Sequence, residues 1–79
     1  MPTVLRIGPY RFQFYGSDMN EPPHVHVKRD RAEAKFWLEP QVRLELQRGY
    51  SQHELNVIQR LTEEHREFLL GEWHAYFRR

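Results

Sequence analysis

The stretch that decides the fold is Asn20-Glu21-Pro22-Pro23-His24-Val25-His26-Val27, in which histidine and valine alternate after a pair of prolines. A β-strand sends successive side chains to opposite faces, so the two histidines share one face and the two valines share the other. Proline donates no backbone hydrogen bond and favours an extended backbone before it, so Pro22-Pro23 sets how the loop enters the strand. The stretch therefore predicts a strand whose valines lie over a core while both imidazoles project outward together.

Composition indicates one small protein of ordinary charge. The 79 residues carry a formal net charge of +1 and no cysteine, so we expect a single domain over residues 1–79 without disulfides or thiolate-bound metal. A net charge of +1 does not by itself indicate a nucleic-acid or membrane partner. No apolar run reaches the roughly 18 residues that a membrane span needs. Arg6 and Arg11 interrupt the N-terminal apolar stretch, so we recognise no signal peptide and expect a cytoplasmic protein.

Other stretches with the period of a strand surround the histidine strand. Residues 3–7 and 10–15 flank Gly8-Pro9 and predict a hairpin. Residues 32–39 predict the strand that follows the histidines, and residues 42–47 predict a last strand at an edge of the sheet because Pro40 precedes it. We therefore predict an α+β protein with an antiparallel sheet of four to five short strands within residues 3–47.

The alternation also predicts which side chains share a face of this sheet. If the strand of His24 and the strand of residues 32–39 form a hairpin, one face is apolar and covers the core. The apolar inner face would hold Val25, Val27, Ala34, Phe36 and Leu38, with Tyr10, Phe12 and Phe14 facing the core from the first hairpin. In the last strand Val42, Leu44 and Leu46 alternate with Arg43, Glu45 and Gln47. The outer face would hold His24, His26, Lys28, Glu33, Lys35 and Trp37.

From Ser51 onward the period changes to that of a helix. Ser51-Gln52-His53-Glu54 is a capping box, and apolar residues then recur at three- and four-residue spacing, which predicts one long C-terminal amphipathic helix over about residues 51–77. Such a helix would be about 40 Å long, whereas strands of five to six residues span roughly 17–20 Å. The overhang would expose Trp73, Tyr76 and Phe77 as a protein–protein interface. The alternative is a bend near Gly71 that folds these aromatic residues back onto the core.

The paired histidines admit three interpretations. In the first, they are catalytic: an imidazole of His24 or His26 acts as a general base and Lys35 stabilises a developing negative charge. In the second, imidazoles at i and i+2 bind a divalent metal ion, with Glu21, Asp18 or Glu33 as a third ligand. Only in this second interpretation is a cofactor expected. In the third, both histidines are ordinary strand residues among charged neighbours.

The turn after the histidine strand is rich in charge. Lys28 and Arg29, with Trp37 nearby, are residue types that contact phosphates and stack on a nucleic-acid base. Asp30 and Glu33 dilute this positive charge, so a solvated hairpin tip is the competing interpretation. His53 and His74 have the pattern of helix-surface residues, and His65 falls on the apolar stripe of the helix.

Several segments together resemble a bacterial family known as domain of unknown function 4160. They are the opening Met-Pro-Thr-Val-Leu-Arg-Ile-Gly, residues 20–27, Ala34-Lys35-Phe36-Trp37-Leu38, Gly49-Tyr50-Ser51, and the helix around Glu54-Leu55, Ile58 and Trp73. Members of that family look like small proteins encoded beside a second small protein of the domain-of-unknown-function 2442 type. The resemblance implies a complex-forming component of a toxin–antitoxin module. His65 departs from the family, in which a small amide residue is expected at that position.

These observations lead to two functional hypotheses. The first is a toxin-like member of a bacterial toxin–antitoxin module that acts on nucleic acid through the polar sheet face of His24, His26 and Lys35. Its expected partner is the small cognate protein, a second copy of the chain, or both. The second is a non-catalytic interaction module or antitoxin-like protein, with a small metal-binding domain as a further alternative.

Overall fold

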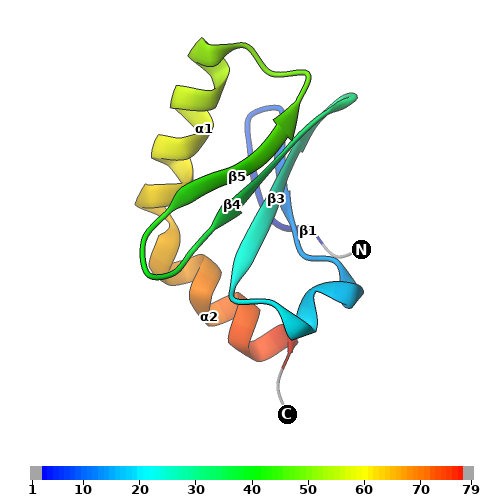
Figure 1. The fold of residues 1–79 in the computed structure, drawn as a ribbon, viewed down its shortest axis with the longest axis vertical. Helices are drawn as coiled ribbons and strands as arrows, with labels where there is room; N and C mark the ends of the chain where they lie inside the picture. The colour runs from blue at the N-terminus through cyan, green and yellow to red at the C-terminus, as the bar shows by residue number, and fades with distance from the viewer. Residues whose placement is uncertain (1–2, 78–79) are drawn as a thin grey trace.

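The structure is a computed structural model that describes residues 3–77, apart from the side chain of Asp18. Five strands form one sheet in the order of the chain, and each strand is antiparallel to its neighbours (Figure 1). The predicted α+β class and antiparallel sheet are confirmed. The elements are β1 (Thr3–Ile7), β2 (Tyr10–Gln13), the 3₁₀ helix η1 (Gly16–Asn20), β3 (His24–Arg29), β4 (Ala32–Trp37), β5 (Arg43–Arg48), α1 (Gln52–Glu64) and α2 (Arg66–Tyr76).

The inner face of the sheet forms the core as the alternation predicts. Val25 pairs with Phe36, and Val27 lies between Phe12 and Ala34, all of them fully buried. Residues directly opposite on antiparallel strands share a face, so these side chains make one continuous apolar layer. The helices cover that layer through Leu55, Ile58 and Leu69.

The C-terminal segment is two helices, and the prediction of one long helix is wrong. The break falls at His65, where φ is −107° and ψ is 17°. The side chain of Arg66 donates to the carbonyl oxygens of Leu38 at 2.6 Å and Pro40 at 3.2 Å, which ties the start of α2 to the connection between β4 and β5. The bend turns α2 toward the end of the sheet where β3 begins (Figure 1). The alternative of a chain that folds back onto its core is therefore the observed one, with the bend six residues before Gly71.

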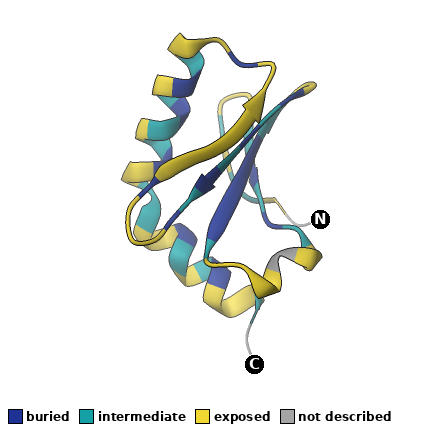
Figure 2. Ribbon diagram, in the orientation of Figure 1, coloured by how far each residue is buried: buried dark blue, intermediate teal, exposed yellow. Residues whose placement is uncertain are grey.

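Strand β5 lies at an edge of the sheet as predicted, but its alternation is interrupted. A bulge skips Glu45, so that Leu44 is opposite Phe36 while Leu46 is opposite Lys35. Leu46 therefore belongs to the outer face and is 56% exposed, whereas uninterrupted alternation would place it on the same face as Leu44. Figure 2 shows β5 exposed along its length, in contrast to the buried first half of β3.

Two further observations complete the description of the fold. Within residues 3–77 the cis peptide bond is at Glu39–Pro40, in the connection between β4 and β5. No helix within residues 3–77 has the length and apolar character needed to cross a membrane.

Candidate functional site

The outer face of the sheet gathers the polar residues that the alternation assigns to it. His24 is directly opposite Trp37, and His26 is directly opposite Lys35. The two imidazole rings are 5.1 Å apart between centroids, in an edge-to-face arrangement. The prediction that both histidines share a face with Lys35 and Trp37 is therefore confirmed. We call His24, His26, Lys35 and Trp37, with Tyr15, Glu21 and Glu33, which contact them, the outer-face cluster.

The depth of the histidines differs from the prediction. His24 is fully buried and His26 is 8% exposed, so the expectation that both rings project into solvent is wrong. Trp73 of α2 lies 5.1 Å from the His24 ring, and Trp37 lies 5.5 Å from it. Because α2 turns back at His65, its indole reaches the start of β3 and encloses a side chain that the strand pattern alone would leave exposed.

His24 is held by backbone as well as by rings. Its Nδ1 lies 3.0 Å from the carbonyl oxygen of Pro22 and 3.7 Å from Oε1 of Glu21. A carbonyl oxygen only accepts, so Nδ1 carries the proton in this hydrogen bond. The proline pair thus fixes the tautomer of His24. Because the His24 ring is buried and its tautomer is fixed, it is suited to holding the neighbouring rings of His26, Trp37 and Trp73 in place.

His26 stands in a more reactive setting. The ring of Tyr15 stacks on it at 3.9 Å, and its Nδ1 lies 3.2 Å from Oε2 of Glu33. The hydroxyl of Tyr15 donates to the same oxygen of Glu33 at 2.7 Å. A carboxylate beside an imidazole is an arrangement that general acid–base chemistry uses. Tyr15, Glu33 and His26 can therefore hold and move a proton at the outer face.

Lys35 provides the positive charge of the cluster. Its Nζ donates to Oε1 of Glu21 at 2.7 Å and lies 4.6 Å above the ring of Trp37. The indole Nε1 of Trp37 in turn donates to Glu45 at 2.8 Å, which uses the residue that the bulge in β5 turns outward. These contacts hold the ammonium and the indole beside the histidines.

The metal interpretation finds no arranged ligand set in the structure. Among the residues described, no group of three or more His, Asp or Glu side chains is placed to hold a metal ion. His24, His26 and Glu21 thus do not form such a group. The side chain of Asp18, another ligand considered for this site, lies outside what the structure describes.

The charged residues predicted to contact nucleic acid are divided between the two faces. Lys28 is opposite Arg11 and Glu33 on the outer face. Arg29 points to the inner side and makes a bidentate ion pair with Glu54 of α1, with two N–O distances of 2.8 Å. This pairing holds the pKa of Glu54 below its usual value and raises that of Arg29. Trp37 and Lys28 therefore share the outer face, whereas Arg29 lies on the inner side of the sheet.

The ion pair between Arg29 and Glu54 also changes the predicted capping box. The Ser51 hydroxyl accepts from the backbone N–H of Glu54 at 3.1 Å, as predicted. The Glu54 carboxylate instead accepts from Arg29 and, at 3.0 Å, from the hydroxyl of Tyr10. Burial and this hydrogen bond raise the pKa of Tyr10. Burial also raises the pKa of Tyr50 to about 12, and its hydroxyl donates to the carbonyl oxygen of Val27 at 2.9 Å. The hydrogen bonds of Tyr10, Arg29, Tyr50 and Glu54 therefore form a structural link between α1 and β3.

The three aromatic residues predicted as an interface have different positions. Trp73 is 5% exposed and packs edge-to-face on Phe14 at 5.3 Å, so it belongs to the core. Phe77 is partly buried against the same ring, whereas Tyr76 is 43% exposed. The expectation that all three overhang the sheet is therefore wrong for Trp73 and Phe77, and the ring of Tyr76, although exposed, lies 6.1 Å from that of Phe14.

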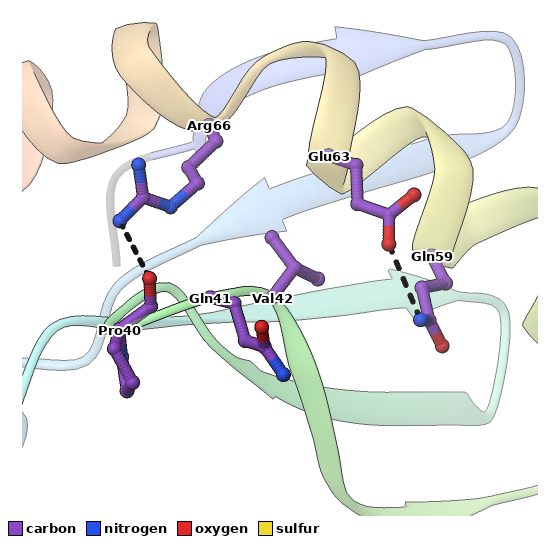
Figure 3. Close-up of a pocket in the computed structure, with 6 residues that line it drawn as sticks. All are labelled: Pro40, Gln41, Val42, Gln59, Glu63 and Arg66. Carbon is purple, nitrogen blue, oxygen red and sulfur yellow. Dashed lines mark hydrogen bonds between the residues drawn. The ribbon is translucent and has the colours of Figure 1, made fainter.

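A hollow of about 470 Å³ lies away from the outer-face cluster (Figure 3). It is an open hollow between the connection of β4 to β5, α1 and the start of α2, and Pro40, Gln41, Val42, Gln59, Glu63 and Arg66 line it. Its polar groups are partly used, because Gln59 donates to Glu63 at 3.3 Å and Arg66 donates to the Pro40 carbonyl. None of the predicted site residues lines this hollow.

Three residues that belong to the outer-face cluster or contact it were missed in the sequence or given another role. Tyr15 follows three aromatic residues in an alternating run and carries no signal that it leaves the strand to stack on His26. Trp73 has the spacing of a helix core residue, and its contact with His24 spans about two thirds of the chain. The sequence places Glu33 on the outer face and offers it a role only as a metal ligand, whereas its observed partners are Tyr15, His26 and Arg48.

The fold and the cluster define a small α+β protein with a five-stranded antiparallel sheet, one face under two helices and the other carrying polar and aromatic side chains. The chain belongs to the family described as Domain of unknown function (DUF4160), whose model matches residues 10–74. The match confirms the family to which the sequence segments pointed; Met1 and Pro2 of the opening segment lie outside the described residues. Comparisons with curated proteins and with solved structures give no match.

Proposed function

We propose that the protein is the toxin-like member of a bacterial toxin–antitoxin module and acts on nucleic acid through the outer face of its sheet. The observation that carries the proposal is the arrangement of His26 against Tyr15 and Glu33, with Lys35 on the neighbouring strand. A carboxylate-oriented imidazole beside a cation is suited to acid–base chemistry on a phosphodiester, whose charge an ammonium stabilises.

The roles of the two histidines differ in this proposal. His26 retains some exposure and is the acid–base group. His24 is fully buried and donates to the Pro22 carbonyl, so it is a positioning residue that fixes the His26 ring. The sequence treats both histidines as equal candidates, and their burial favours His26.

The proposed partner is the small cognate protein of the domain-of-unknown-function 2442 type that family members are expected to accompany. Such a module works in the bacterial cytoplasm, where the partner would neutralise the toxin. Exposed apolar side chains support a protein partner or a second copy: Leu46 on β5 is 56% exposed, and Phe68 and Tyr76 on α2 are 47% and 43% exposed.

The experiment is controlled expression in a bacterial host, with growth as the readout. The parent is expected to arrest growth, and His26→Ala is expected to relieve the arrest while it retains the parent's circular dichroism spectrum. His74→Ala is the matched control, because this histidine is exposed on α2. Arrest by His26→Ala equal to that of the parent would remove the catalytic proposal.

A non-catalytic interaction module is the second candidate, and the burial of His24 favours it. Pull-down of the neighbouring gene product separates it from the first. An interaction module binds that protein with unchanged affinity when His26 is replaced and loses binding with Phe68→Ala or Tyr76→Ala. If the parent leaves growth unaffected but binds the partner, the second candidate is the correct one.

A further inference from the structure

We propose that a row of cationic side chains across the outer face of the sheet binds the phosphate backbone of single-stranded nucleic acid. The row is set by strand register: Arg6 is opposite Arg11, and Arg11 is opposite Lys28. Lys28 is opposite Glu33, which is opposite Arg48. We call Arg6, Arg11, Lys28 and Arg48 the cationic row.

The row places like charges directly opposite one another on two successive strand pairs. Such pairs destabilise a sheet, and strand neighbours are normally chosen to avoid them. Within residues 3–77, Arg6, Arg11 and Lys28 make no ion pair. The Nε of Arg11 is buried and has no hydrogen-bond partner within the same residues. An anionic ligand would provide the missing counter-charge.

The acidic residue within the row does not neutralise it. The carboxylate of Glu33 accepts from Tyr15 at 2.7 Å and lies 3.2 Å from Nδ1 of His26. Its other oxygen is 3.6 Å from Arg48, whose side chain is 70% exposed. Glu33 is therefore shared with the outer-face cluster.

Charge is also separated between the two layers of the molecule. The helical layer from 52 to 76 is acidic, since it carries Glu54, Glu63, Glu64, Glu67 and Glu72 against Arg60 and Arg66. The small net charge of the chain thus conceals a cationic sheet face opposite an acidic helical face. An anionic polymer is attracted to the former and repelled by the latter.

The aromatic side chains beside the row favour a single strand over a duplex. Neighbouring strands are about 4.8 Å apart, so the row spans about 19 Å from β1 to β5. Tyr15 stacks on His26, which is two residues along β3 from Lys28, and Trp37 is four residues along β4 from Glu33, so the two rings lie on the same face at roughly 7 and 13 Å along the strands from the row. Unpaired bases stack on such rings while the backbone follows the cations, whereas paired bases are not available for stacking. This inference rests on the proposed nucleic-acid target and defines it as single-stranded.

The test is fluorescence anisotropy of the full chain with a labelled oligouridine of about 12 nucleotides, measured over a range of salt concentrations. Each cation that neutralises a phosphate contributes about 0.7 to the slope of log K against log salt. The parent is expected to show a slope between about 2 and 3. The double variant Arg11→Gln/Lys28→Gln should lower the slope by about 1.4 and weaken binding at low salt.

Two variants control for general charge and for folding. Arg60→Gln removes one positive charge from the exposed side of α1, where the double variant removes two from the row, and should leave the slope unchanged. Lys28→Arg should retain the slope of the parent. The proposal is overturned if the parent does not bind, if Arg60→Gln lowers the slope by the roughly 0.7 expected for each cation of the row, or if a matched duplex or anionic vesicles bind more tightly than the single strand.

This result is independent of the growth assay. If binding depends on the cationic row but the expressing cells grow normally, the proposal that the row binds nucleic acid is supported and the proposal that the protein is a toxin is contradicted. If His26→Ala relieves growth arrest but the parent does not bind the oligouridine, the toxin proposal is supported and the proposal that the row binds single-stranded nucleic acid is contradicted.

Discussion

The two faces of the sheet are built from the same alternating strands, yet they differ in what determines them. On the inner face, Val25, Val27 and Phe36 are fully buried, and a period of two residues is sufficient to place them. On the outer face, the same period places His24 and His26 together, but their burial depends on Tyr15 and Trp73 from other elements. Alternation thus determines the face of a side chain, and tertiary packing determines its depth.

The largest expected effect is a cavity on the inner face. Phe36→Ala removes a fully buried ring between β3 and β5 and should lower the free energy of unfolding by about 3–5 kcal/mol. Lys35→Ala, its neighbour on the outer face, should cost at most about 1 kcal/mol, since it breaks an ion pair with a largely exposed carboxylate. Urea denaturation of the two variants measures the contrast. Equal losses would contradict the assignment of the two faces.

Trp73 links the two faces, because it contacts Phe14 of the core and His24 of the outer face. Trp73→Ala should cost about 3 kcal/mol and should also make His24 accessible to an acylating reagent, which can be followed by mass spectrometry. Tyr76→Ala, three residues further along α2 and 43% exposed, is the control and should cost less than about 1 kcal/mol. If His24 of the parent reacts as fast as it does in the Trp73 variant, the ring is not enclosed.

Gly49 tests the turn between the sheet and α1. Its φ is +88°, and a Cβ at this position would lie 3.0 Å from Cα of Ala32. Gly49→Ala therefore adds a strained backbone conformation to a close backbone contact and should cost about 1–3 kcal/mol. Gly71→Ala is the matched change at an open helical position, where a Cβ meets nothing within 4 Å, and should be neutral or stabilising. Thermal denaturation compares the two, and a smaller loss for Gly49→Ala than for Gly71→Ala would refute this description of the turn.

The ion pair between Arg29 and Glu54 predicts a dependence on pH. Hydrogen bonds from Arg29 lower the pKa of Glu54 from its ordinary value of 4.5. The carboxylate therefore contributes stability that is present above pH 4.5 and is lost as the pH falls through the lowered pKa. Glu54→Gln should reduce stability at neutral pH and make the loss on acidification less steep. Glu64→Gln, on the exposed side of α1, should follow the parent curve, and a Glu54→Gln curve parallel to that of the parent would count against the pair.

Much of the fold could be predicted from local patterns. The strands, the apolar face, the edge position of β5 and the start of α1 follow from alternation, proline and the Ser51 cap. The break at His65 could not, because the apolar stripe continues through it as Ile58, Thr62, Leu69 and Trp73. What fixes the break is a contact of Arg66 with carbonyl oxygens 26 and 28 residues earlier in the chain.

The candidate site shows the same limit. Period two brings His24, His26, Lys35 and Trp37 to one face, as predicted. It cannot show that a bulge at Glu45 moves Leu46 to that face, or that Arg29 leaves the surface to pair with Glu54. The cationic row could not be predicted either, because it depends on the register of β1, β2, β3 and β5. The net charge of the chain does not reveal it, since acidic residues elsewhere offset these cations.

The most direct test of the account is to map the surface that meets nucleic acid. In ¹⁵N-labelled protein, a single-stranded oligonucleotide should shift the amide resonances of β2, β3 and β4, with Arg11, Lys28 and Lys35 among the largest changes, and should leave those of α1 unchanged. Shifts confined to the helices, or no shift at an oligonucleotide concentration well above that of the protein, would contradict a functional outer face.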